Sequence, residues 1–259
     1  MTQPADVITP IALAVAAAAA ARSTWSPCGL SMLSTITPFG ERVRGYRFGV
    51  TAAWFVAGAA VGGASLGVPG ALLAAAYGAG VAGHTVITAV LAALVSLAGA
   101  AVDGELLGPL LPLHRRQVND RWLSRYRRWV YAGGFGWQMG SGVTTYIMTS
   151  AVFTMAFLAL ISGSPAVSIV VCTTFGTLRG LAVLLTSRAS TPDKLRRLHR
   201  WMDTIRESVR WSTIVIQSGA GLAAVMIIGA VPAAAVAVAV LAAVAVKVRP
   251  ALIGRMPSQ

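Results

Sequence analysis

The stretch FGVTAAWFVAGAAVGGASL at residues 48–66 carries no charged side chain and consists almost wholly of apolar and small residues. A helix that crosses a membrane needs about 20 mainly apolar residues, and this stretch meets that length. The chain as a whole agrees with it, because only 11% of its 259 residues are charged, 56% are hydrophobic and the mean hydropathy is +0.72. A soluble domain carries about 25% charged residues. The sequence therefore predicts an all-α membrane protein.

Similar apolar stretches lie on both sides of this one, and their lengths suit single crossings. The predicted spans are residues 8–39, 48–66, 70–102, 135–161, 166–186, 212–231 and 233–246. The last is short, and Lys247 and Arg249 would complete it by extending to the lipid headgroups. We therefore expect about seven transmembrane helices.

The charged residues alternate with these spans in a regular way. Lys and Arg concentrate in residues 41–47, 103–128 and 187–210 and in the tail after residue 246, whereas the turns at 67–69, 162–165 and 232 carry no charge. Cytoplasmic loops of membrane proteins are enriched in Lys and Arg. The alternation of basic segments and uncharged turns predicts a multi-pass protein of the cytoplasmic membrane with its N-terminus outside and its C-terminus inside. It also argues against the interpretation that the net charge of +13 serves to bind nucleic acid.

Two of the basic segments have the pattern of amphipathic helices. In residues 191–210 an N-cap threonine and a proline start the pattern, and apolar residues recur three and four positions apart at Leu195, Leu198, Met202, Ile205 and Val209. Residues 115–129 resemble this pattern, with Trp122, Tyr126 and Trp129. We expect both helices to lie on the anionic inner leaflet of the bilayer. A docking surface for a protein partner is the alternative.

The spans form two triplets of opposite orientation, as in inverted-repeat membrane proteins. The first repeat is predicted at residues 1–129, the second at 130–231 and a seventh helix with a basic tail at 232–259. Each triplet opens with an element that polar residues interrupt, at 25–38 and at 137–149. Breaks at matching positions of two halves point to a site between them, because freed backbone groups within a membrane need water or protein partners. The alternative is that Pro27 and Pro38 only kink packed helices.

We therefore expect the two breaks to line one polar cavity. The candidate substrate-binding residues are Arg22, Ser26, Pro27, Ser31, Ser34, His84, Gln138, Gly140, Ser141, Thr144 and Thr145. No Asp or Glu falls within a predicted span, so Arg22 is expected to bias the cavity toward anions. Arg179, near the inner end of the fifth span, is expected to reach the headgroups. The spacing of Gly58 and Gly62, and of Gly136 and Gly140, predicts close helix packing.

The segment Ser26-Pro27-Cys28, followed by apolar residues and Pro38, resembles the opening motif of the CcdA/DsbD family of transmembrane thiol-disulfide carriers. This resemblance implies two inverted triplets with one cysteine in the first helix of each. It also implies transfer of reducing equivalents in cytochrome c biogenesis. The second cysteine is missing, because Gly140 stands where it should lie and Cys172 falls in the fifth span.

Three functions remain open from the sequence. A transporter of a small anionic solute is favoured, because the second cysteine is missing. A thiol-disulfide oxidoreductase would use Cys28 as its catalytic residue, and a scaffold subunit would dock other proteins through its basic helices. We expect neither a metal ion nor a cofactor, because no Cys/His cluster of metal-binding spacing and no nucleotide-binding motif is found.

Overall fold

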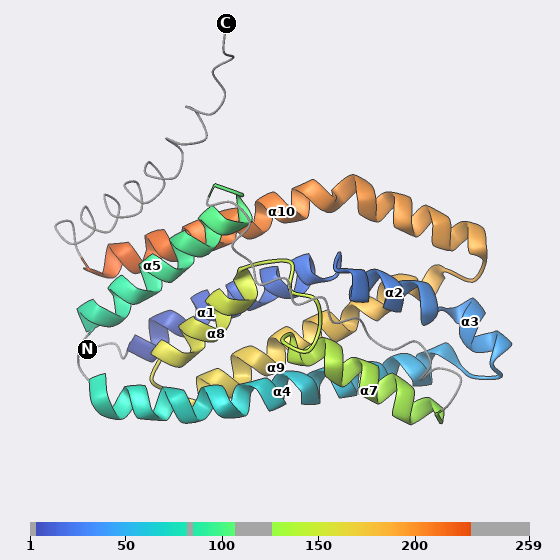
Figure 1. Cartoon of the computed structure of the whole chain (residues 1–259), viewed down its shortest axis with the longest axis horizontal. Coiled ribbons are helices and arrows are strands. Elements are labelled where there is room, and N and C mark those ends of the chain that lie inside the picture. Colours follow the sequence, from blue (N-terminus) through green and yellow to red (C-terminus); the bar gives the residue numbers. More distant parts are fainter. Residues whose placement is uncertain (1–3, 82–84, 107–125, 229–259) are drawn as a thin grey trace, which may run out of the picture.

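The computed structural model describes residues 4–81, 85–106 and 126–228, and every regular element within these ranges is helical (Figure 1). The all-α prediction is thereby confirmed for the described residues. In chain order the helices are α1 (Pro4–Ser23), α2 (Pro27–Thr35), α3 (Pro38–Val43), α4 (Phe48–Val81), α5 (Thr85–Asp103), α7 (Arg128–Ser141), α8 (Ala151–Ile161), α9 (Pro165–Leu181), the 3-10 helix η1 (Ala182–Arg188) and α10 (Pro192–Ile228).

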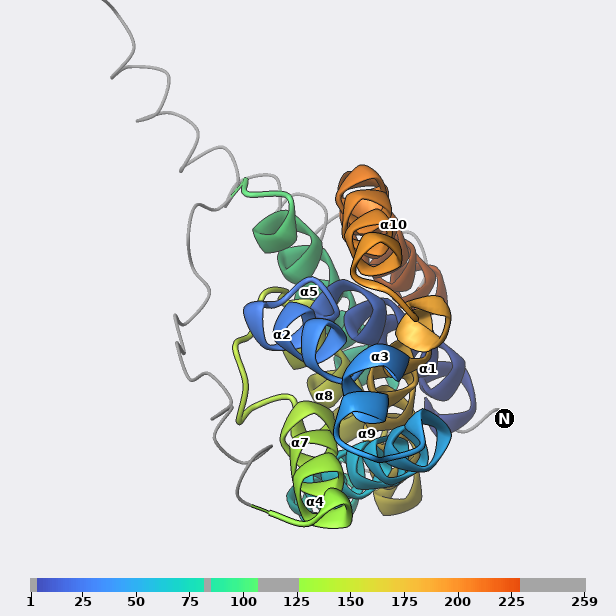
Figure 2. The ribbon, with the colours of Figure 1, turned by 90° about the vertical axis from the view of Figure 1, so that its right-hand side faces the viewer.

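The helices form three layers, and the long helix α4 lies in one of the two outer layers (Figure 2). Seen along the long axis, α4, α7 and α9 lie together on one side, and α5 pairs with α10 on the other (Figure 2). Between these layers lie α1 and α8, and α1 contacts α8, α9 and α10. One apolar core joins α1, α5, α8 and α9 through residues such as Val15, Met155 and Phe175. A second core surrounds α2 and α7.

Glycines bring the backbones of α4 and α7 into direct contact. A Cβ atom added to Gly58 would collide with the backbone of Gly133, and one added to Gly136 or Gly140 would collide with the backbone of Phe55 or Ala59. Only residues without a side chain allow this approach, which increases van der Waals contact where no hydrophobic effect acts between helices. The prediction that these glycines serve close packing is confirmed.

Helix α4 continues through the position where the sequence predicted a turn. Its 34 residues extend about 51 Å at 1.5 Å per residue, and Pro69 lies inside it. The predicted turn at 67–69 is therefore wrong, and so is the prediction that residues 70–102 form one span. Gly67 and Gly70 lie directly against Ile169 and Ser168 of α9, and this contact supports the helix on both sides of Pro69.

Helix α10 likewise joins two elements that the sequence kept apart. Its 37 residues include the predicted amphipathic segment 191–210 and most of the predicted sixth span. The apolar face of the amphipathic segment contacts protein, because Met202 is 1% exposed and its carbonyl oxygen accepts a 3.0 Å bond from the Trp25 indole. The prediction that this face lies in lipid is wrong. The other predicted amphipathic helix, 115–129, lies mainly outside the described residues.

Two elements are broken where the sequence predicted breaks. Between α1 and α2 the chain bends by 67°, because Ser26 caps the new helix through a 3.1 Å bond from the Gly29 amide and Pro27 occupies its first turn. Between α7 and α8, residues 142–150 form an irregular segment that begins at Gly142 with a φ of +70°, a backbone conformation that favours glycine.

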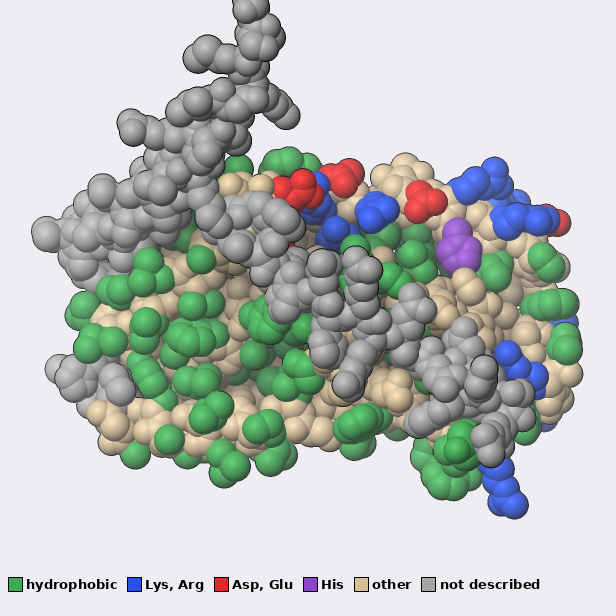
Figure 3. Space-filling model, viewed as in Figure 1, with side chains coloured by type: hydrophobic (Ala, Val, Ile, Leu, Met, Phe, Trp, Pro, Cys, Tyr) green, Lys and Arg blue, Asp and Glu red, His purple; other side chains and the backbone are tan. Residues whose placement is uncertain are grey.

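Among the described residues, three helices are long and apolar enough to cross a membrane, at Phe48–Gly80, Thr85–Asp103 and Pro165–Arg188. The bent pair Ile8–Ser23 and Pro27–Thr35 makes a fourth if it counts as one span. On the face shown in Figure 3, Lys and Arg side chains gather toward the end of the molecule that holds α3 and the starts of α7 and α10. The described part of the protein is thus compatible with membrane association.

Candidate functional site

Arg179, in the last turn of α9, is the most deeply buried cation of the described residues. It is 1% exposed, whereas the sequence analysis expected it to reach the headgroups; that prediction is wrong. The signal that was missed is its spacing. Cys172 and Gly176 lie seven and three positions before Arg179, which places all three on the buried face of α9. The side chain therefore turns into the protein and cannot extend along the helix to water.

The Arg179 guanidinium connects the two broken elements. Its Nη1 donates to the carbonyl oxygen of Met139 at 2.8 Å and to Oγ1 of Thr145 at 3.1 Å. Its Nη2 lies 3.4 Å from Oγ of Ser26. Met139 lies in the last turn of α7, Thr145 in the segment after it, and Ser26 at the bend before α2. The two breaks therefore lie within reach of one side chain, which fills the space between them.

The electrostatics of this site are unusual for a buried charge. No ion pair of Arg179 with a carboxylate is found among the described residues, and its Nε has no hydrogen-bond partner there. Part of the compensation comes from α7, because the last carbonyl groups of a helix carry a partial negative charge. A second part comes from the ring of Phe175, whose centroid lies 5.9 Å from Cζ of Arg179.

Hydroxyl groups satisfy the carbonyl groups that are freed at the end of α7. The carbonyl oxygen of Gln138 accepts bonds from Ser141 at 2.9 Å and from Thr144 at 2.8 Å, and these two hydroxyls lie 2.6 Å apart. These predicted site residues therefore act on their own backbone. Of the predicted set in the second repeat, Thr145 contacts Arg179 directly, and Gly140 packs against α4.

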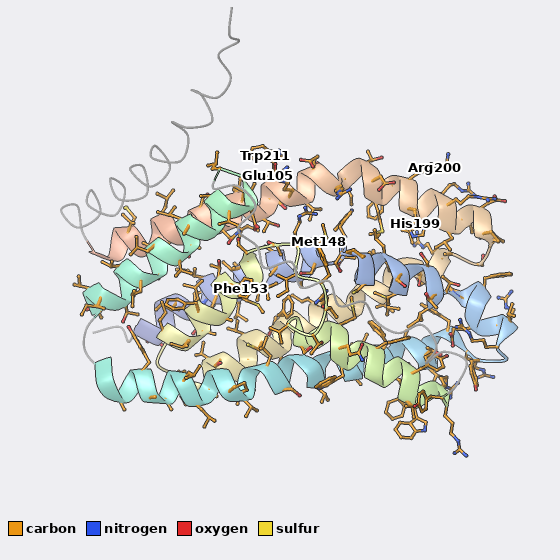
Figure 4. All side chains as sticks on the ribbon, viewed as in Figure 1. Glu105, Met148, Phe153, His199, Arg200 and Trp211 are labelled. Atoms are coloured by element: carbon orange, nitrogen blue, oxygen red, sulfur yellow. The ribbon has the colours of Figure 1, made fainter. Side chains whose placement is uncertain are left out.

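The remaining predicted site residues are dispersed. Ser31 lines a small cavity of about 20 Å³ beside Cys28, while Pro27 is exposed. Ser34 is also exposed, and its hydroxyl lies 3.3 Å from Nε2 of His199, which points from α10 toward α2 (Figure 4). His84 lies outside the described residues.

A second polar cluster, which is partly buried, surrounds Asp103 at the end of α5. Its carboxylate accepts bonds from Thr149 at 2.6 Å, from the Ser150 amide at 2.8 Å and from Gln217 at 2.8 Å. These donors come from the start of α8 and from α10. Sequence reasoning missed this cluster because it assigned Asp103 to a loop. The only signal was that an acidic residue ended an apolar helix.

Arg22 lies near this second cluster and not beside Arg179. Its Nη1 is buried with no hydrogen-bond partner among the described residues. The guanidinium is within electrostatic range of Asp103 and Glu207 and of Arg206 and Arg210. The expectation that Arg22 lacks an acidic neighbour is therefore wrong. Asp103 is the last residue of α5, whereas the predicted span ended one residue before it.

A third buried cluster centres on Glu41, which is fully buried in α3. Its carboxylate accepts bonds from Arg44 at 2.7 Å, Thr51 at 2.6 Å and Tyr131 at 2.8 Å. Tyr131 belongs to α7, so this carboxylate fixes the start of α7 against α3 and α4. All three donors bond the same carboxylate, and they come from both halves of the chain. The Glu41 cluster therefore holds the two halves together.

Neither cysteine forms a disulfide and both are buried, Cys28 beside Trp25 and Met32 and Cys172 against Gly63. The Ser-Pro-Cys motif is explained by the start of α2, where Ser26 is the N-cap and Pro27 the first helical residue. It is thus a signal of helix initiation.

Comparison with known proteins gives a consistent result. The chain is 29% identical to the methylamine utilization protein MauF of Paracoccus denitrificans. That match covers 222 residues, 83% of this chain and 77% of the relative. The proteins of the same name from Paracoccus versutus and Methylophilus methylotrophus are 27% and 29% identical over 79% of this chain, covering 74% and 72% of those relatives. No family model and no solved structure matches the chain.

These relatives overturn the functional predictions from the sequence. The resemblance to CcdA/DsbD carriers is wrong, because the relatives that match most of the chain carry the name MauF. Solute transport, thiol-disulfide exchange and cytochrome c biogenesis conflict with the same name and are set aside. The resemblance rested on Ser26-Pro27-Cys28 and Pro38, and the prolines of this pattern lie at the starts of α2 and α3.

Proposed function

We propose that this chain is a multi-pass membrane protein with an accessory role in methylamine utilization. The observation that carries the proposal is the similarity to MauF proteins of several bacteria over 69–83% of the chain. The similarity is spread along the chain, whereas a shared local motif would be confined to a few turns of helix. The membrane placement is supported independently by three helices of suitable length and hydropathy.

We further propose that the contact between Arg179 and the two breaks is the working centre of the protein. A buried cation without a paired carboxylate is costly, and an ionisable residue inside a predicted span is a functional candidate for that reason. Arg179 joins Ser26 in the first half to Met139 and Thr145 in the second. A change in the relative position of the halves must therefore rearrange its hydrogen bonds.

The proposed topology has seven crossings in two inverted triplets, with the N-terminus outside and the C-terminus in the cytoplasm. The distribution of Lys and Arg along the chain supports it. Reporter fusions at Met1, at Gly163 between α8 and α9, and at Ser190 before α10 test it. We expect external, external and cytoplasmic signals, and a cytoplasmic signal at Gly163 would contradict the topology.

Complementation tests the function. A Paracoccus denitrificans strain that lacks its own MauF would receive this chain, and growth on methylamine would be compared with growth on succinate. We expect the chain to restore growth on methylamine and to leave growth on succinate unchanged. Arg179→Met should abolish the restoration, whereas Arg196→Gln, at an exposed arginine paired with Asp193, should not. Failure of the intact chain despite normal membrane levels would contradict the proposal.

A further inference from the structure

A basic recess lies where the long apolar helix of the second half ends. It has a volume of about 480 Å³ and is formed by the end of η1, the turn after it and the first turns of α10. The residues that line it are Ser187, Arg188, Ala189, Ser190, Lys194 and Arg197. Three of these six residues are cationic and two carry hydroxyls, which is the composition of a site for a phosphate group.

The positive charge of this recess is not neutralised by the nearby carboxylate. Asp193 forms its ion pair with Arg196, which lies outside the recess. None of the ion pairs among the described residues involves Arg188, Lys194 or Arg197. Lys194 donates to Ser190 at 3.0 Å, a neutral partner that leaves its charge in place. An anion entering the recess therefore meets three uncompensated cations.

The helix that leads into the recess exposes a row of leucines. Leu178, Leu181, Leu184 and Leu185 are 38%, 39%, 46% and 41% exposed. In a 3-10 helix residues three positions apart lie above one another, so Leu185 lies on the same side of η1 as Arg188. Residues Pro165–Arg188 form one of the helices suited to cross a membrane. The apolar row therefore ends at the cations.

We propose that this recess binds the headgroup of an anionic phospholipid, with an acyl chain lying along the leucine row. A free phosphate ion would use the cations alone and would gain nothing from Leu181 and Leu185. A lipid would contact both features, because its acyl chain would lie along the leucines within the span and its headgroup would meet the cations at the end of the span. The inference rests on the membrane placement proposed above and is independent of the role in methylamine utilization.

Native mass spectrometry of the full chain released from detergent tests the site. The probes are dioleoyl phosphatidylglycerol, dioleoyl phosphatidylcholine and inorganic phosphate, each titrated against the intact protein. We expect saturable binding of phosphatidylglycerol and much weaker binding of the other two. Binding of inorganic phosphate with an affinity equal to that of phosphatidylglycerol would overturn the lipid assignment.

Variants separate the recess from general attraction to a basic surface. Each cation near an anionic headgroup contributes about 1 kcal/mol, so Arg188→Gln and Arg197→Gln should each weaken phosphatidylglycerol binding about fivefold and together about 25-fold. Arg196→Gln removes the same charge from the residue directly before Arg197 and should change phosphatidylglycerol binding less than twofold. Equal weakening by all three substitutions would overturn the site. Leu185→Ser should weaken binding as well, and an unchanged affinity there would overturn the acyl-chain contact.

Discussion

Replacing Arg179 distinguishes a structural cation from a functional one. Arg179→Met keeps a flexible unbranched side chain but shortens it and removes its charge, whereas Arg179→Lys keeps the charge and removes the planar fork. Nη1 makes both short bonds, at 2.8 Å to Met139 and 3.1 Å to Thr145, while Nη2 lies 3.4 Å from Oγ of Ser26. The lysine side chain is shorter and has one nitrogen, so it cannot keep the bonds of Nη1 and the contact of Nη2 together.

The magnitudes predict an unexpected order of stability. Two hydrogen bonds from a charged donor contribute about 3–6 kcal/mol together, and burial of the charge costs several kcal/mol. Removing both in Arg179→Met should leave the free energy of unfolding within about 2 kcal/mol of the original value. Arg179→Lys keeps the cost of burial and loses at least one bond, so it should be destabilised by about 1.5–3 kcal/mol. We therefore expect lysine, the more conservative change, to be the less stable variant.

The two buried thiols provide the assay. Cys28 and Cys172 are 3% and 2% exposed, so a thiol-reactive fluorophore reports unfolding of the detergent-solubilised chain during heating. One kcal/mol corresponds to about 2–4 °C in a domain of this size, which predicts a Tm for the lysine variant about 3–12 °C below that of the original protein. A methionine variant that melts well below the lysine variant would refute the argument that the cost of burying the charge offsets its hydrogen bonds. A methionine variant that supports normal growth on methylamine would refute the functional role.

Three further substitutions test the packing and the other polar clusters. Gly140→Ala places a methyl group against the backbone of α4 and should destabilise the protein by about 3 kcal/mol, whereas Gly133→Ala on the same helix, whose nearest neighbour would be 3.9 Å away, should be tolerated when both are compared by thermal unfolding. Asp103→Asn weakens the bonds of three donors and should lower the unfolding free energy by about 2–4 kcal/mol. The control Glu105→Gln changes a side chain that is 78% exposed in its ion pair, and it should change the unfolding free energy by less than about 1 kcal/mol. Equal effects of the two substitutions would contradict the burial argument. Glu41→Gln should lower the Tm through loss of charge-assisted bonds, by about 2 kcal/mol, and an unchanged Tm would show that the cluster does not hold the halves together.

Several features of the site could be predicted because their causes are local. Ser26 and Pro27 are a helix-start signal whatever surrounds them, and the bend before α2 was found where they predicted it. Ser141 and Thr144 were predicted to line a substrate cavity, but their hydroxyls donate to the carbonyl oxygen of Gln138, three and six residues before them. Contacts within one or two turns depend on spacing, and spacing is visible in the sequence.

Other features depended on contacts between distant parts of the chain. Pro69 is normally a signal to end a helix, yet α4 continues through it because glycines of α4 lie against α9, about a hundred residues away. Arg179 was assigned to the headgroups by its place near the end of a span. Its actual direction follows from partners in α7 and at the start of α2, 34 to 153 residues away in sequence.

The sequence by itself determined that the protein is helical and compatible with a membrane, because composition and the length of apolar stretches act through solvent and do not depend on which helix lies beside which. Only the tertiary structure decided which polar residues meet. Asp103, Glu41 and Arg179 each form hydrogen bonds with donors or acceptors from other helices. Such partners are fixed by the packing of glycine-lined backbones, in which a displacement of an ångström changes the neighbour.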